Sequence, residues 1–435
     1  MARRWWKGLL WGLALLALSS CVQPDSFGEP IRVTLTPYAT ITAPVVTIAV
    51  VTAPTIEAGM TSVPEMSQTV PFELPVGAGT PVPVKSDPIL PETISEITEL
   101  ARWEMGFVNA LVFSPDGDTL MVGLGDYWSG QPSFGVRVVD PNDGKLLLDT
   151  GLLGDISTAV HSGSVVGVDV SPDGTLLASA EEDGWLRLWR LPAGELIAEW
   201  ENPGYLTGLL ISPDCSTTSG CILAVGVNEP QQWGQVVLWQ VADGDFLTLG
   251  GVPEQTGTLV EKYGRINSLR YSSDGKMLAS GSKGIVRVWR VTDGAALLSL
   301  EENTAMVSAL AFSPDGRLLA AGTERGDVSV WQLGEPRKAG FGNLLISLPK
   351  ENDSVTGLQF SPEWQLLFVG YQSGVVQVWQ MGGDQPLEPV YQTKEVGGRI
   401  TSLAISPAGD LLVLGINDIY QSGGPVTVWG IPDGE

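Results

Sequence analysis

Residues 307–332 read VSALAFSPDGRLLAAGTERGDVSVWQ, three apolar runs separated by polar turn residues. An apolar run ends at residues 313–316 in Ser-Pro-Asp-Gly, where proline fixes one φ angle, aspartate accepts bonds from nearby backbone and glycine takes a positive φ. A second apolar run follows over 318–322, and a third run alternates apolar residues over 328–331. Short apolar runs separated by tight turns are typical of antiparallel β-strands.

The same pattern recurs seven times along the chain. Each copy has a small residue at its third position and a turn at its end, and the copies begin at Val108, Val165, Leu206, Ile266, Val307, Val355 and Ile400. Small residues suit the innermost strand of a radial array, where backbones crowd together. We therefore predict an all-β fold over residues 94–435, a seven-bladed β-propeller with four-stranded antiparallel blades.

The third strand ends in tryptophan in six copies, at Trp189, Trp239, Trp289, Trp331, Trp379 and Trp429. With the turns and a spacing of about 48 residues, these strands resemble the WD-repeat family. The resemblance covers residues 97–431 and implies a rigid disc that binds other proteins. The family's aspartate after the tryptophan is replaced, by Arg190, Gln240, Arg290, Gln332, Gln380 and Gly430. The family's hydrogen-bonded tetrad of His, Ser or Thr, Asp and Trp is therefore not expected as such.

The two ends of the repeat region predict how the ring closes. The seventh unit lacks a fourth strand after Trp429, whereas Glu99–Glu104 precedes the first unit and is similar to the fourth strand Glu195–Glu201 of the second unit. We therefore expect Ile97–Glu104 to complete the seventh blade. Pairing of this kind removes two free sheet edges at once.

The N-terminal residues 1–20 have the features of an export signal, in which cations precede a short apolar run. The run ends in Leu-Ser-Ser followed by Cys21, which resembles the bacterial lipobox and implies a lipid on Cys21. An ordinary signal peptide with a chance cysteine is the alternative. Residues 21–93 are rich in proline and threonine and predict a flexible linker. Within the linker, the apolar segment Val45–Thr52 either stays free or docks as a strand.

The composition excludes several classes of function. The chain has 24 Lys and Arg against 49 Asp and Glu, so its formal net charge is −25 and no nucleic-acid partner is expected. One histidine and three cysteines are too few for a Cys/His zinc cluster, and no calcium-loop spacing occurs. We expect no metal, no cofactor, no catalytic residues and no enzymatic activity. Without a nucleophile motif, His161 is expected to be structural, and Glu181–Asp183 to form a solvated turn.

Two of the three cysteines lie close together in the sequence. Cys215 and Cys221 flank the first turn of the third unit, which is longer than the equivalent turns. In an exported protein an isolated pair at this spacing predicts a local disulfide. Metal binding by two thiolates alone is the weaker alternative.

Long loops between the second and third strands carry polar and aromatic residues in the first, third and seventh units. The candidate binding rim comprises Asp126, Tyr127, Trp128, Phe134, Trp233, Asp418 and Tyr420. The first and seventh units are neighbours in a closed ring, so their loops are expected to converge and to contact a protein or glycan. The alternative is that these side chains fold down and fill local gaps.

Together these features predict a monomeric bacterial lipoprotein of the cell envelope or cell surface, anchored to the membrane by lipid on Cys21. Its propeller is expected to be a non-catalytic platform or scaffold for protein partners. Two alternatives stay open: a propeller hydrolase or glycan-binding protein acting on envelope polysaccharide, and a Tol-like envelope assembly component. The repeated strand Val-x-Val-Trp favours the WD-repeat interpretation over the Tol-like one.

Overall fold

The computed structural model describes residues 75–125, 134–151, 161, 163–215, 220–228, 234–241, 254–260, 264–301, 305–334, 340–363, 365–381, 389–418 and 423–433. All of them belong to one compact unit, Thr69–Glu435. The predicted signal peptide, Cys21 and Val45–Thr52 lie outside the described residues. Among the described residues is a three-residue 3-10 helix, η1 (Ile94–Glu96), and no helix there is long and apolar enough to cross a membrane.

Seven four-stranded antiparallel sheets make up the described fold, which confirms the predicted β-propeller. Blade 1 consists of β2 (Val108–Phe113), β3 (Leu120–Leu124), β4 (Gly135–Val139) and β5 (Leu146–Asp149), and blade 2 of β6 (Val165–Val170), β7 (Leu176–Glu181), β8 (Trp185–Arg190) and β9 (Glu195–Glu201). Blade 3 consists of β10 (Tyr205–Ile211), β11 (Cys221–Asn228), β12 (Gly234–Val241) and β13 (Glu254–Val260), and blade 4 of β14 (Ser268–Tyr271), β15 (Met277–Ser282), β16 (Ile285–Arg290) and β17 (Ala296–Leu300).

The remaining three blades follow the same order. Blade 5 consists of β18 (Val307–Phe312), β19 (Leu318–Thr323), β20 (Val328–Gln332) and β21 (Asn343–Ser347), and blade 6 of β22 (Val355–Phe360), β23 (Leu366–Tyr371), β24 (Val376–Gln380) and β25 (Tyr391–Gln392). Blade 7 consists of β26 (Arg399–Ile405), β27 (Leu412–Asn417), β28 (Gly424–Gly430) and β1 (Thr98–Gly106). The last blade therefore combines both ends of the described chain.

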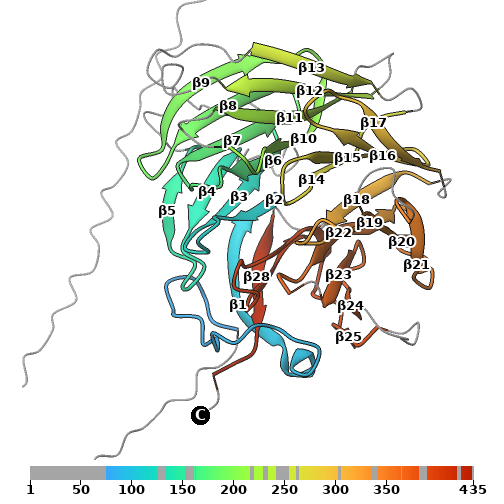
Figure 1. The fold of residues 1–435 in the computed structure, drawn as a ribbon. Helices are drawn as coiled ribbons and strands as arrows, with labels where there is room; N and C mark the ends of the chain where they lie inside the picture. Colours follow the sequence, from blue (N-terminus) through green and yellow to red (C-terminus); the bar gives the residue numbers. More distant parts are fainter. Residues whose placement is uncertain are drawn as a thin grey trace, which may run out of the picture. The chain divides into compact units, whose positions relative to one another are not determined.

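The first strand of every blade lies next to the axis of the ring. The seven first strands contact one another in a closed circle. Figure 1 shows β2, β6, β10, β14, β18 and β22 toward the centre, with β5, β9, β13, β17 and β21 at the outside. Small residues permit this crowding: a Cβ added to Gly167 in β6 would stand 2.7 Å from the backbone nitrogen of Leu209 in the next blade. The predicted small third position therefore has a direct steric cause.

The Ser-Pro-Asp-Gly turns are held by a repeated set of hydrogen bonds. In blade 5, Ser313 Oγ donates to Asp315 Oδ1 at 2.6 Å and accepts from the Leu318 backbone N–H at 2.9 Å. Asp315 Oδ1 also accepts from the Arg317 backbone N–H, and Gly316 has a φ of 68°. The Ser-to-Asp bond recurs at 114–116, 171–173 and 272–274. Turn chemistry thus fixes the first hairpin of each of these blades.

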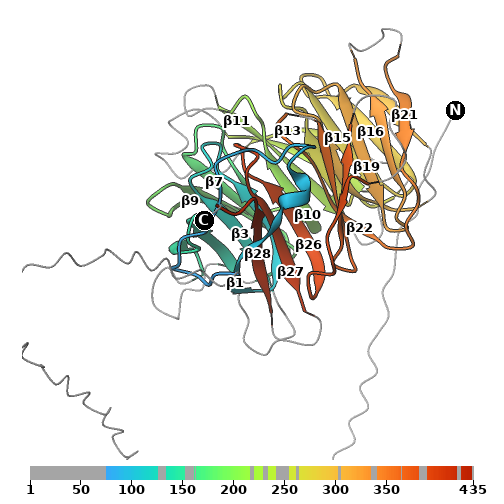
Figure 2. The same cartoon turned by 90° about the horizontal axis from the view of Figure 1, so that it is seen from below.

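Strand β1 closes the ring by pairing antiparallel with β28, as the sequence predicts. The register places Glu99 opposite Trp429 and Trp103 opposite Val426, and Figures 1 and 2 show β1 and β28 side by side. The Trp103 side chain is only 1% exposed. It lies in an apolar cluster with Val139 of blade 1, so β1 both completes blade 7 and packs against the first blade.

Residues 75–93, which the proline content assigns to the flexible linker, lie against the propeller instead. The Val76 N–H donates to the Leu100 carbonyl of β1 at 2.8 Å, and the Ile89 N–H donates to the Gly409 carbonyl at 2.8 Å. The side chains of Val76 and Ile89 are buried. Prolines are compatible with this irregular path because it uses few backbone donors. The folded part therefore extends further toward the N-terminus than the predicted boundary at residue 94.

Candidate functional site

The six tryptophans at the ends of the third strands are packing residues between blades. Five are buried and Trp239 is half-buried. Trp189 of blade 2 shares an apolar cluster with Val136 and Val138 of blade 1, and Trp331 of blade 5 shares one with Val286 of blade 4. None of the buried rings offers a surface to a partner, so candidate binding surfaces lie elsewhere.

A buried polar cluster in blade 2 surrounds the chain's single histidine. His161 Nδ1 lies 3.1 Å from Glu181 Oε1, its Nε2 lies 3.0 Å from Thr150 Oγ1, and its ring stacks on Trp189 at a centroid distance of 5.6 Å. Glu181 also forms an ion pair with Arg187. The side chains of His161 and Glu181 are 0% and 1% exposed. The expectation that Glu181 belongs to a solvated turn is therefore wrong, because the carboxylate turns inward to these partners.

The electrostatics of this cluster favour a neutral imidazole. Burial, and after it the positive charge of Arg187, lower the pKa of His161 from 6.5 to about 3, although the charges of Asp149 and Asp183 oppose the shift. In the neutral form, Nδ1–H donates to Glu181 and Nε2 accepts from the Thr150 hydroxyl. Because the ring is sealed from solvent, the cluster acts on folding stability rather than on a substrate.

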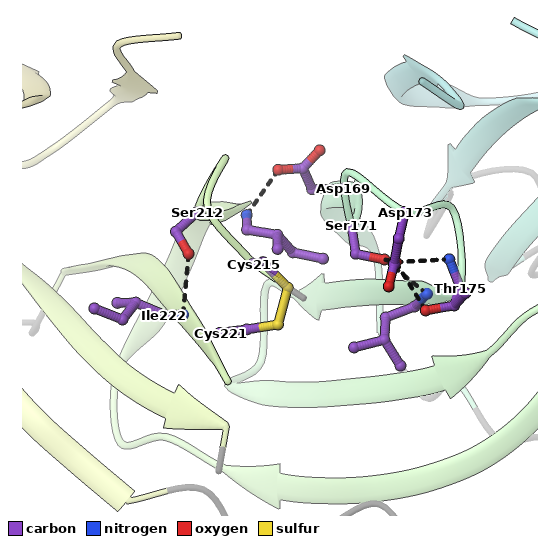
Figure 3. Close-up of a disulfide and its surroundings, with 10 residues drawn as sticks. Asp169, Ser171, Asp173, Thr175, Ser212, Cys215, Cys221 and Ile222 are labelled. Atoms are coloured by element: carbon purple, nitrogen blue, oxygen red, sulfur yellow. Dashed lines mark hydrogen bonds between the residues drawn. A yellow bond between two sulfur atoms is a disulfide. The ribbon is translucent and has the colours of Figure 1, made fainter. Parts of the chain in front are cut away.

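A disulfide joins Cys215 and Cys221 in the structure, across the first turn of blade 3 (Figure 3). Their Cα atoms are 4.3 Å apart, and both side chains are buried in the apolar cluster shared by blades 2 and 3. The Cys215 N–H donates to the Ser212 carbonyl at 3.0 Å. The bond therefore links Cys215 to the first residue of β11, at a point where the sequence departs from the Ser-Pro-Asp-Gly pattern of the neighbouring blades.

Removing this disulfide is expected to lower the free energy of unfolding by about 2 kcal/mol, because the short loop of the unfolded chain regains its freedom. The measurement is urea denaturation of a Cys215→Ser, Cys221→Ser variant under oxidising conditions. Reduced wild-type protein is expected to have the same free energy of unfolding as the variant. Adding reductant is expected to leave the stability of the variant unchanged. Equal stability of wild type and variant would show that the bond adds nothing to the fold.

Most of the predicted binding rim lies outside the described residues. This applies to Asp126, Tyr127, Trp128, Trp233 and Tyr420. Phe134 is half-buried and comes directly before β4. Asp418 follows β27 and forms an isolated bridge with Gly423. The convergence of these loops stays a prediction.

A polar channel runs along the axis of the propeller. Its cavity of about 460 Å³ is lined by the first strands of all seven blades. Side chains at one end bridge neighbouring blades: Ser308 Oγ donates to the Val355 carbonyl at 2.6 Å, and Thr401 Oγ1 donates to the Val108 carbonyl at 2.5 Å. These bonds hold the first strands together around the ring.

Two charged residues line this channel, one on blade 2 and one on blade 4. Asp169 accepts from the backbone N–H groups of Val170 at 2.9 Å and Ile211 at 2.7 Å, and therefore joins blades 2 and 3. Figure 3 shows its carboxylate bonded to a backbone nitrogen beside Ser212. Burial raises the pKa of Asp169 to about 6, an effect that its hydrogen bonds and the charge of Arg270 oppose. The Arg270 side chain is exposed within the channel, but the surrounding strands desolvate it and lower its pKa, an effect that the charge of Asp169 opposes. Asp169 and Arg270 therefore stabilise each other's charge, and two backbone N–H groups stabilise the Asp169 carboxylate, so both residues have a structural role.

A recess of about 590 Å³ opens at the channel mouth on the face opposite the Ser-Pro-Asp-Gly turns. Strand β18 connects the two faces of the propeller: it begins at Val307, next to the recess, and ends at Phe312, next to the Ser-Pro-Asp-Gly turn of blade 5. Glu324, Gln372 and Arg399 reach the recess from blades 5, 6 and 7. The Gln372 side-chain oxygen, turned toward the guanidinium, accepts from Arg399 Nε at 3.1 Å and Nη2 at 2.7 Å.

Sequence reasoning missed this recess because its three residues are far apart along the chain. Glu324 and Arg399 are exposed, and Gln372 is half-exposed. The remaining lining residues are mostly hydroxyl and amide side chains, among them Asn109, Ser308 and Thr401. Polar groups with a few charges around a shallow recess suit recognition of a polar chain segment by hydrogen bonds.

No group of three or more His, Cys, Asp or Glu side chains in the described part of the chain is arranged to hold a metal ion. The expectation that the protein lacks metals and cofactors stays a prediction.

Comparison with known proteins finds WD40 repeats in this chain. The family described as WD domain, G-beta repeat, matches residues 156–190, 253–290 and 294–332. A solved propeller, the Cps50 (Swd1) β-propeller domain of Myceliophteria thermophila, superimposes with a TM-score of 0.61 at 16% identity, and the match covers 77% of this chain and 99% of that one. That likeness concerns the fold alone.

Curated relatives match over shorter stretches and come from eukaryotes. The small ribosomal subunit protein RACK1 of Schizosaccharomyces pombe is 29% identical over 30% of this chain and 39% of its own length. Subunit I of eukaryotic translation initiation factor 3 from Emericella nidulans is 31% identical over 28% of this chain and 34% of its own length. The chain therefore spans less than half the length of these relatives.

Proposed function

Because the chain carries WD40 repeats on a closed seven-bladed propeller, we propose that it is a non-catalytic platform that binds a protein partner. The recess lined by Glu324, Gln372 and Arg399 carries this proposal. These polar side chains come from three blades, are accessible to solvent, and lie on a scaffold whose inner strands are hydrogen-bonded across blades. Binding residues on a rigid scaffold lose little conformational freedom when a partner docks.

We also propose that the protein is located outside the cytoplasm. The sequence Leu-Ser-Ser before Cys21 supports export and lipid attachment. The buried disulfide between Cys215 and Cys221 supports an oxidising compartment, where such bonds persist. The lipid would tether the platform to a membrane while its recess stays available to partners in the envelope or at the surface.

Crosslinking in cells followed by co-purification tests the platform. Exchanging the charges at the recess, with Glu324→Arg and Arg399→Glu, is expected to reduce capture of a defined partner at least about tenfold, because it reverses both charges. The matched control exchanges charges on the opposite face with Asp118→Arg and Lys145→Glu. It is expected to keep the partner. A Tyr127→Ala, Trp128→Ala, Tyr420→Ala variant tests whether the predicted rim contributes to the same surface.

Several outcomes of this experiment contradict the proposal. If the recess variant and its control capture the same proteins equally well, the recess is not the binding surface. If the purified chain cleaves envelope polysaccharide, it is a hydrolase and not a passive platform. The same cells test the anchor: Cys21→Ala is expected to release the protein from the membrane fraction, and retention of this variant would contradict lipid anchoring.

A further inference from the structure

A second concave surface lies between blades 4 and 5, on the face that carries the Ser-Pro-Asp-Gly turns. It encloses about 510 Å³ and is lined by turn residues of both blades, among them Asp274 and Asp315. We call it the blade 4/5 groove. It lies at the opposite end of the strands from the recess at the channel mouth, so it is independent of the proposed function.

The floor of the blade 4/5 groove is apolar. Met277 and Leu297 are half-buried, and Leu333 is buried beneath them. All three belong to the apolar cluster that joins blades 4 and 5. A pocket of this volume with an apolar floor accommodates a few buried side chains, and a thioether such as that of Met277 adapts its shape to them.

Cations surround this floor. Lys276 and Arg317 have side chains that are 78% and 80% exposed, and Arg290 completes the rim. Lys276 pairs with Asp274 at 3.0 Å, and Arg317 lies 3.7 Å from Asp315. Exposed ion pairs of this kind contribute little to stability, so both cations can turn toward an incoming carboxylate at small cost.

The aspartates next to these cations are hydrogen-bonded within their own turns. Asp274 Oδ1 accepts from Ser272 Oγ at 2.8 Å and from the Lys276 N–H at 3.1 Å. Asp315 makes the equivalent bonds in blade 5. The carboxylates are therefore held back in the turns, whereas the long cationic side chains extend from them.

Charge is distributed unevenly along the propeller, and the groove lies in its least acidic sector. Residues 264–334 contain eight of the 24 Lys and Arg but seven of the 49 Asp and Glu, so the sector has a formal charge of +1 in a chain of −25. An acidic partner is repelled by most of the protein but not here. A concave groove of about 510 Å³ admits a few side chains of a chain segment, whereas a bilayer presents a broad flat surface, so the shape of the groove favours a peptide partner over a membrane.

We propose that the blade 4/5 groove docks an acidic peptide segment of a partner protein. Leucine-like side chains of the segment bury against Met277 and Leu297, and flanking carboxylates pair with Lys276 and Arg317. The apolar contact supplies affinity, and the charges select acidic over basic segments.

Fluorescence anisotropy with a labelled synthetic peptide of alternating Glu-Glu and Leu tests this proposal on the full chain. We expect saturable binding at low salt, and at least about a tenfold loss of affinity in a Lys276→Glu, Arg317→Glu variant. A matched Lys145→Glu, Lys283→Glu variant reverses two exposed charges elsewhere and is expected to change affinity less than about twofold. A peptide with serine in place of leucine is expected not to bind.

Three results would overturn the docking proposal. The first is a lack of saturable binding up to about 1 mM peptide. The second is an equal loss of affinity in the groove variant and its matched control. The third is binding of phosphatidylglycerol vesicles that depends on Lys276 and Arg317 while peptide binding does not, which would assign the groove to a membrane. Variants at Glu324 and Arg399 are expected to keep peptide binding, so failure of one surface is distinguishable from failure of the other.

Discussion

Replacing Trp103 with alanine is expected to lower the free energy of unfolding by about 3–5 kcal/mol. Each interface between blades that contains a third-strand tryptophan is filled by that ring, but the first repeat has Val139 at this position. Trp103 of β1 supplies the missing aromatic ring to the interface between blades 7 and 1. A Cβ added to Gly144 in the adjoining turn would stand 2.5 Å from Trp103 Cδ2, which shows how tightly the ring is enclosed. Urea denaturation followed by circular dichroism measures the loss.

The matched control for Trp103 is another tryptophan outside the tightly packed interfaces. Trp185, at the start of β8, is half-exposed. Trp185→Ala is therefore expected to cost less than about 1.5 kcal/mol. If the two substitutions cost the same, the aromatic ring of β1 is not what holds blades 7 and 1 together. Trp103→Phe is expected to fall between the two, because part of the buried area is kept.

Acidification is expected to destabilise the protein through His161. The folded state keeps this imidazole neutral until the pH approaches 3, whereas the unfolded chain takes up the proton near pH 6.5. Because the unfolded state then binds more protons, stability is present in full above pH 6.5 and falls as the pH decreases toward 3. The expected loss is about 1.4 kcal/mol per pH unit, or roughly 3 kcal/mol between pH 6.5 and pH 4.5.

A His161→Gln variant isolates this effect. The groups that face the ring stay in place in the variant, and they are Thr150, Glu181, Arg187, Trp189, Asp149 and Asp183. Asp169, whose raised pKa acts in the opposite sense, is present in both proteins and cancels in the difference. Denaturation at several pH values is expected to give a shallower pH dependence for the variant. Parallel curves for the two proteins would contradict a buried neutral histidine.

The fold was predictable because its signals are local and repeated. The turn at Ser313 and its equivalents depends on hydrogen bonds within six residues, so the sequence alone reveals it. Closure by β1 was predictable because Glu99–Glu104 resembles Glu195–Glu201 in another blade. In both cases the same sequence pattern occurs more than once in the chain, which makes each copy easier to identify.

The surfaces were not predictable because they depend on residues from different blades. Glu324, Gln372 and Arg399 meet only when blades 5, 6 and 7 are arranged around the axis. The burial of Glu181 depends on His161 in the preceding loop and on Arg187 in the next strand. A charged residue beside a turn has the same local sequence pattern whether it faces water or the interior.

The pairing of β1 with β28 also has a kinetic consequence. Thr98 pairs with Gly430, so a strand that is synthesised early can pair only after a strand near the C-terminus has been synthesised. Contacts between residues this far apart form slowly, because the chain must first lose the entropy of a very long loop. Until then the apolar face of β1, with Leu100 and Trp103, has no partner in blade 7 and is prone to aggregation. A ring closed by its two ends is therefore stable once formed and vulnerable while it is being made.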